Sequence, residues 1–181
     1  MHPQLTEILD QLDDTERRAQ ALAARAQGDA WMRRPSPTTW SPSDCVQHLV
    51  TSIDAFLPLV DEVLDTTPRP SPPDTRRYSA GWLGRILLWS IEPPYRMRVR
   101  TAARFVPGAP RSVDVDLAEF MTRHAEWRSR MARADGLPLD RLRIVSPFDR
   151  RVRYSLYTTF RIVPTHERRH LWQAERVLAG A

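Results

Sequence analysis

The chain has 181 residues, a length that favours a single domain over residues 1–181, and no apolar run approaches the ~18 residues needed to cross a membrane. All 27 basic residues are arginine and the formal net charge is +5. Because the arginines are scattered and lie near Asp or Glu in the sequence, we interpret this charge as compositional and do not expect nucleic-acid binding. The single cysteine, Cys45, and an N-terminus without an apolar signal core lead us to expect a cytoplasmic protein without membrane association.

Apolar residues recur at helical spacing in several stretches of the chain. The first stretch covers residues 3 to about 26. The second opens on the helix start SPSD at residues 41–44, where Ser41 is the expected N-cap, and runs to about residue 65. These two stretches predict the first two long helices of the protein.

The middle of the chain is less regular. Residues 66–112 are rich in proline, and only residues 80–91 suggest a short helix there. A third long helix is expected over about 114–134. Residues 139–153 suggest short extended pieces, and the last helix should begin by about Tyr154. The elements together predict an all-α protein, an up-and-down four-helix bundle with long irregular connections.

The last helix contains the sequence THERRHLWQ at residues 165–173. His166 and His170 lie four residues apart and so share one helix face. That face continues an apolar seam running from Val152 to Val177, which indicates that both imidazoles point into the bundle. Pro164 either bends this helix or breaks it. The histidine spacing is typical of metal ligands.

A metal held by only two histidines would be poorly fixed, because catalytic sites normally supply three protein ligands. The best third candidate is His48, which lies beside the apolar seam of the second helix. His2 is close to the N-terminus, and we interpret His124 as a partly buried histidine bound by a neighbour. Cys45, one turn before His48, either approaches the metal or packs in the core.

Two motifs resemble the DinB-like metalloenzyme superfamily. They are TWSP leading to QHL, within residues 39–49, and HERRHLWQ at residues 166–173. The resemblance implies a four-helix bundle in which His48, His166 and His170 bind a divalent metal. It also implies relatives that are transferases or isomerases using a low-molecular-weight thiol, many relatives without an established reaction, and frequent pairing into homodimers.

We therefore expect a metal-dependent enzyme acting on a small molecule, with Zn²⁺ favoured and Ni²⁺ or Mn²⁺ as alternatives. The metal would activate a thiol or water for transfer or hydrolysis. Glu167 and Gln173 are the candidate catalytic side chains. Gln173 lies one turn beyond His170 on the same face, whereas Glu167 points about 100° away from His166 and alternatively forms a solvent-facing ion pair with an arginine.

Other function classes remain open from the sequence. The bundle could be a non-catalytic module that uses its metal for stability or its arginine-rich surface for a partner. Residues 166–170 also read H-E-x-x-H, the zinc peptidase signature. Those enzymes usually take their third ligand from downstream, and no histidine follows His170, so we rank the peptidase low, together with nucleic-acid binding.

Overall fold

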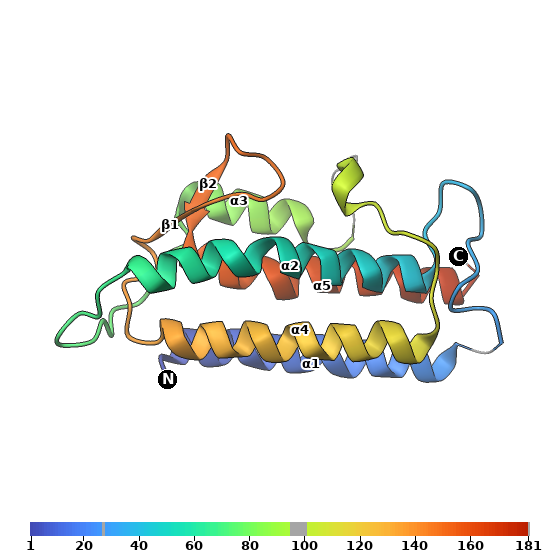
Figure 1. Ribbon diagram of the computed structural model, residues 1–181, viewed down its shortest axis with the longest axis horizontal. Helices are drawn as coiled ribbons and strands as arrows, with labels where there is room; N and C mark the ends of the chain where they lie inside the picture. Colours follow the sequence, from blue (N-terminus) through green and yellow to red (C-terminus); the bar gives the residue numbers. More distant parts are fainter. Residues whose placement is uncertain (27, 95–100, 181) are drawn as a thin grey trace.

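The computed structural model describes residues 1–26, 28–94 and 101–180. The elements are α1 (Pro3–Arg25), α2 (Pro42–Thr66), α3 (Gly81–Ile91), the 3₁₀ turn η1 (Ala103–Phe105), α4 (Val113–Ala134), β1 (Arg143–Val145), β2 (Arg153–Ser155) and α5 (Leu156–Leu178). Helices α1, α2, α4 and α5 form a bundle, with α3, η1 and the hairpin outside it (Figure 1). The predicted all-α four-helix bundle is therefore confirmed. None of the described helices is long and apolar enough to span a membrane.

The bundle helices do not alternate in direction along the chain, which corrects the up-and-down order expected from the sequence (Figure 1). Both α1 and α2 pack between α4 and α5. Helices α1 and α5 run the same way, and so do α2 and α4 (Figure 1). The reason is the long connection between α2 and α4, in which α3 runs opposite to α2, so that α4 starts at the same end as α2 does (Figure 1). Helix α2 has 25 residues and is about 37 Å long, so the connection has to cover roughly this distance.

Helix α2 begins at Pro42, where the sequence predicted it. Ser41 Oγ accepts a hydrogen bond from the backbone N–H of Asp44 at 3.1 Å, and an Asp44 carboxylate oxygen accepts one from the backbone N–H of Ser41 at 2.9 Å. This reciprocal capping box satisfies two N–H groups that a helix start leaves unpaired. Arg34 adds two hydrogen bonds to the same carboxylate. The start of α2 is thereby fixed one turn before His48.

The irregular stretch before the last helix forms a small antiparallel hairpin, in which Ile144 of β1 lies opposite Tyr154 of β2. Helix α5 starts at Leu156, because Ser155 caps it by accepting from the N–H of Thr158. Val152, which the sequence placed on the helical seam, lies before β2 and outside α5. That part of the prediction is wrong.

Pro164 lies within α5, which continues through it as one helix. The alternative of a break between two shorter helices is therefore excluded. The seam residues after Val152 stay on one helical face, so His166 and His170 are presented to α2 together.

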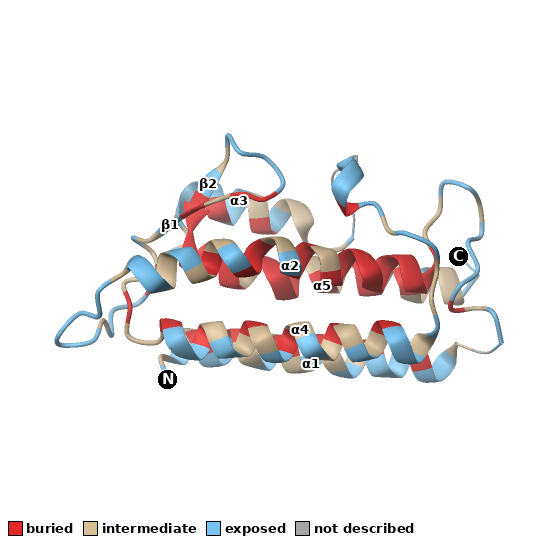
Figure 2. Cartoon of the chain, viewed as in Figure 1, coloured by how far each residue is buried: buried red, intermediate tan, exposed pale blue. Residues whose placement is uncertain are grey.

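The buried residues lie along the inner faces of the helices (Figure 2), and the apolar ones form two clusters, one at each end of the bundle. On α4, Trp127 belongs to the first cluster and Phe120 to the second. On α5, Val163 is the last residue of the first cluster and Leu171 is the first residue of the second. Buried polar side chains occupy the level between the clusters. They include Thr15, His48, His124, Glu167 and His170.

Candidate metal centre

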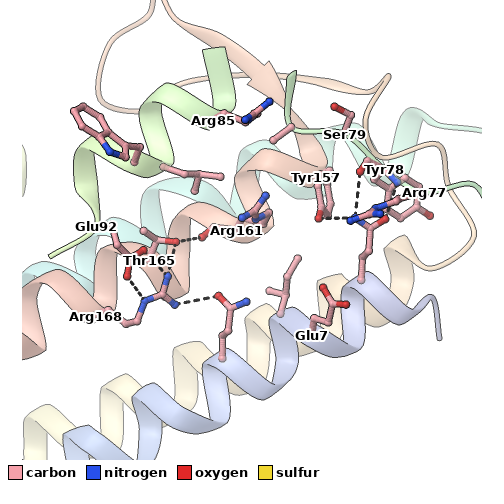
Figure 3. A pocket seen from close by; sticks show the side chains of 16 residues that line it. Glu7, Arg77, Tyr78, Ser79, Arg85, Glu92, Tyr157, Arg161, Thr165 and Arg168 are labelled. Carbon is pink, nitrogen blue, oxygen red and sulfur yellow. Dashed lines mark hydrogen bonds and ion pairs between the residues drawn. The ribbon is translucent and has the colours of Figure 1, made fainter. Parts of the chain in front are cut away.

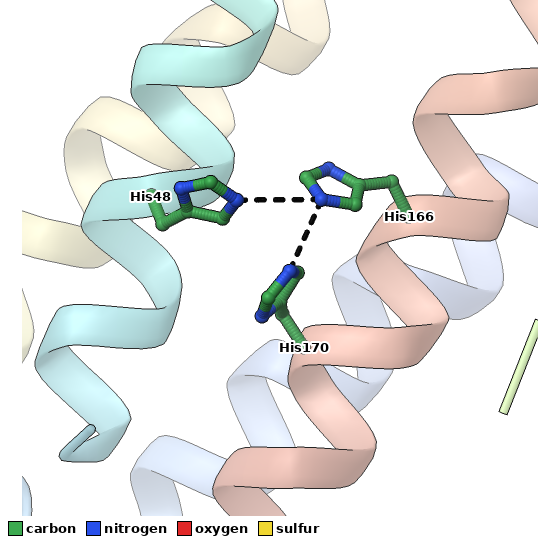
Figure 4. A group of neighbouring side chains, drawn as sticks. All are labelled: His48, His166 and His170. Carbon is green, nitrogen blue, oxygen red and sulfur yellow. Dashed lines mark hydrogen bonds between the residues drawn. The ribbon is translucent and has the colours of Figure 1, made fainter. Parts of the chain in front are cut away.

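Three histidines from two helices meet at this level. Nε2 of His166 lies 3.3 Å from Nε2 of His48 and 3.0 Å from Nε2 of His170 (Figure 4). In the described part of the chain, they are the only group of three His, Cys, Asp or Glu side chains arranged to hold a metal ion. The antiparallel packing of α2 against α5 joins residues 118 positions apart in the sequence.

The hydrogen-bond roles of these rings favour a cation. Nδ1 of His48 lies 2.8 Å from the carbonyl oxygen of Phe105, so it carries the proton and Nε2 presents a lone pair. One proton on Nε2 of His166 can satisfy only one of its two Nε2 neighbours. Two ligands about 2.05 Å from one tetrahedral ion are about 3.3 Å apart, close to the separations observed. The arrangement fits a divalent metal.

The protonation state is suited to metal binding as well. Burial lowers the pKa of His48, and lowers the pKa values of His166 and His170 well below the ordinary range. The positive charge of Arg169 acts on all three rings in the same direction, and the rings disfavour protonation of one another. The imidazoles are therefore neutral near pH 7, the form that binds metals.

Aromatic side chains from three connections surround the histidines. Trp40, from the loop before α2, stacks on His170 with ring centroids 5.7 Å apart. Phe148, from the hairpin turn, lies 6.1 Å from His166 and 4.6 Å from Phe105 of η1. These rings cover the centre with apolar surface and lower the polarity around it.

The comparison with known families agrees with this geometry. A profile described as the DinB superfamily matches residues 11–174, which include all three histidines. The chain belongs to the DinB superfamily. No curated protein and no solved structure matched it.

In this DinB chain, Gln173 lies close to the centre. Burial lowers the pKa of His170, and the nearby Gln173 side chain opposes that shift only weakly. Nδ1 of His170 is buried and has no hydrogen-bond partner among the described residues. Gln173 is therefore the nearest candidate for orienting that ring.

Glu167 is turned away from the three histidines. It is 1% exposed, so the expected solvent-facing ion pair with an arginine is wrong. One carboxylate oxygen lies 2.8 Å from Nε2 of His124, and the other accepts a hydrogen bond of 2.6 Å from Thr15 Oγ1. Glu167 thus joins α5 to α4 and α1, and neither oxygen serves the metal centre.

The expectation that His124 is a buried histidine bound by a neighbour is confirmed, and its partners are two carboxylates. It is fully buried, and its Nδ1 lies 2.8 Å from a carboxylate oxygen of Glu16. Because both ring nitrogens meet carboxylates, both carry protons. Burial lowers the pKa of His124, but the two carboxylates outweigh it and raise the pKa to about 9. The same contact acts on the carboxylate: the pKa of Glu16 is lowered to about 2, mainly by the hydrogen bond from His124.

Neither Cys45 nor His2 joins the centre. Cys45 is fully buried in the second core cluster, where burial raises the pKa of its thiol. It packs as an apolar side chain. His2 caps α1, its Nδ1 accepting a hydrogen bond from the backbone N–H of Gln4.

Proposed function

We propose that this DinB-superfamily protein is a divalent-metal-dependent enzyme acting on a small molecule. The observation that carries the proposal is the convergence of three histidine Nε2 atoms that protons alone cannot satisfy. Three nitrogen ligands suit Zn²⁺ best, with Ni²⁺ and Mn²⁺ as alternatives. Such a ligand set leaves a coordination position for water or a low-molecular-weight thiol. When bound, the ion would lower the pKa of that ligand and supply hydroxide or thiolate for hydrolysis or transfer.

The chain's own residues prepare this chemistry. The Phe105 carbonyl fixes the tautomer of His48 and directs its Nε2 to the centre. Trp40 and Phe148 place apolar ring surface against His170 and His166, respectively. The charge of Arg169, which acts on all three histidines, favours an anionic nucleophile there. Gln173 is proposed to orient His170.

The position of Glu167 argues against the zinc peptidase reading of H-E-x-x-H. A peptidase needs this glutamate as a general base beside the metal-bound water. Here both carboxylate oxygens are engaged, by His124 and Thr15, inside the bundle. We assign Glu167 to the positioning of α5.

Elemental analysis of untagged protein tests the proposal. Wild type should hold about one divalent ion per chain, and His48→Ala and His166→Ala should each lose it. His2→Ala is the matched control and should keep it, since His2 lies at the start of α1. No metal in wild type after reconstitution with zinc, nickel and manganese would refute the centre. Stoichiometric metal without turnover in thiol-transfer and hydrolysis screens would favour a metal-stabilised, non-catalytic module.

We further propose a homodimer. Its support is the outer face of α3, where Trp82, Leu83 and Ile86 are 75%, 41% and 54% exposed. A contiguous apolar surface of this kind commonly marks an interaction site. Light scattering should give twice the 21.0 kDa chain mass for wild type, and Ile86→Glu should give the monomer mass. A monomeric wild type would contradict the proposal.

A cytoplasmic location is also proposed. It is supported by the single, reduced Cys45, which is buried in the core.

A further inference from the structure

A pocket of about 810 Å³ lies between α1, α3 and α5 (Figure 3). Helix α5 lines it with Tyr157, Arg161, Thr165 and Arg168, which share one helical face. At 100° per residue, the two metal-centre histidines of α5 point roughly 140–180° away from Arg161. Helix α5 therefore separates the pocket from the candidate metal centre, and the pocket is a second site.

The charge of this pocket is unbalanced. Four arginines line it against two glutamates. Arg168 is neutralised, because it donates to both carboxylate oxygens of Glu92 at 2.7 Å each. Arg77, Arg85 and Arg161 have no ion-pair partner among residues 1–26, 28–94 and 101–180. The pocket consequently keeps an excess of positive charge.

Three side chains of the lining, Arg85, Tyr157 and Arg161, have hydrogen-bond donors without an acceptor among the described residues. The side chain of Tyr157 is 5% exposed, and its hydroxyl oxygen accepts from Gln4 Nε2 at 2.8 Å. The hydroxyl proton has no acceptor in the described chain, so Tyr157 can donate it to a ligand. The guanidinium of Arg161 lies over the Tyr157 ring, 5.7 Å from its centroid. Arg85 lines the same space from α3 (Figure 3). Donors without acceptors that line one pocket are complementary to an oxyanion.

Part of the lining is apolar. Leu88 and Trp89 of α3 face the pocket, and Trp89 is 57% exposed. An aromatic surface beside guanidinium groups suits a ligand that carries an apolar part next to its charge. We propose that this pocket binds a small organic oxyanion, a carboxylate or a phosphate monoester. Its oxygens would lie between Arg85, Arg161 and the Tyr157 hydroxyl, and its carbon body against Leu88 and Trp89.

Calorimetric titration with phenyl phosphate and phenylacetate, at low ionic strength, tests the proposal. Wild type should bind at least one of them, and the preferred probe identifies the oxyanion. Arg161→Gln should weaken binding at least tenfold, and Tyr157→Phe about fivefold, because each removes a hydrogen bond to a charged group. Arg25→Gln is the matched control. It removes the same charge from an exposed position at the far end of α1 and should change affinity less than about twofold.

His170→Ala separates this site from the metal centre. The variant should bind the preferred probe as wild type does, even if the proposed metal site fails. Loss of binding in His170→Ala would place the probe at the metal centre and overturn the proposal. So would equal weakening by Arg25→Gln and Arg161→Gln, or no binding of either probe at ~5 mM. If Arg161→Gln does not fold, Arg85→Gln provides the same test from an exposed position.

Discussion

Nε2 of His124 on α4 lies 2.8 Å from a carboxylate oxygen of Glu167 on α5, the residue that directly follows the candidate ligand His166. The other nitrogen of His124 meets Glu16 of α1 at the same distance. One buried imidazolium thus joins three bundle helices at the level of the metal centre. This contact sets the position of α5, which carries two of the three metal ligands.

The first prediction concerns alkaline pH. Because the folded state raises the pKa of His124 from 6.5 to about 9, its contribution is complete well below pH 6.5 and is lost as pH rises through about 9. The contribution of His124 to the free energy of unfolding in urea should fall by about 2 kcal/mol between pH 7 and 9.5, in addition to the loss from Cys45, whose thiol pKa burial also raises. His124→Gln should remove the His124 part of this dependence and leave the smaller part that comes from Cys45. An unchanged slope in that variant would assign the effect to another group.

The second prediction separates stability from metal binding. Glu167→Gln keeps the side chain's size but removes one of two charges facing His124, and should destabilise the fold by about 3 kcal/mol. Metal content should not change. Glu175→Gln is the control on the same helix, because its half-exposed pair with Arg18 should be worth less than about 1 kcal/mol. Loss of metal from Glu167→Gln without loss of stability would return Glu167 to the metal centre.

The third prediction concerns acidic pH. The pKa values of His166 and His170 lie well below the ordinary range. Both rings therefore stay neutral below pH 6.5, where protons compete little with the metal for their nitrogens. Metal-loaded wild type should keep its ion on dialysis at about pH 6. His170→Ala should hold no stoichiometric ion at either pH 6 or 7. Release of half the metal from wild type near pH 6.5 would show that the ligands titrate normally.

The fourth prediction concerns the other end of the bundle. Buried Asp116 on α4 accepts hydrogen bonds from Trp31 Nε1 at 2.9 Å and Ser43 Oγ at 2.6 Å. Arg111 also donates to it at 2.9 Å. Asp116→Asn places an amide among these donors and should lower the unfolding free energy by about 2 kcal/mol. Asp114→Asn, exposed in the same first turn, should cost below about 1 kcal/mol. If Asp116→Asn and Asp114→Asn lower the unfolding free energy equally, the stabilisation by Asp116 comes only from its charge at the N-terminus of α4.

The sequence by itself determined the local structure of this protein. The start of α2 at Ser41 and Pro42 follows from capping chemistry within four residues. The shared face of His166 and His170 follows from helical periodicity. The family was also recognisable, because its two motifs are short and contiguous in the chain.

The tertiary structure decided which faces meet. Helical periodicity indicates that Glu167 points away from His166. It contains no information about a contact with a residue 43 positions earlier on α4, so the buried contact with His124 was not predicted. The convergence of His48 with His166 likewise depends on packing α2 against α5 across 118 residues. The parallel pairs of helices and the pocket beneath α3 depend on how α3 and the segment before it pack against α1 and α5. Contacts between distant segments are set by the packing of whole faces, which no local pattern contains.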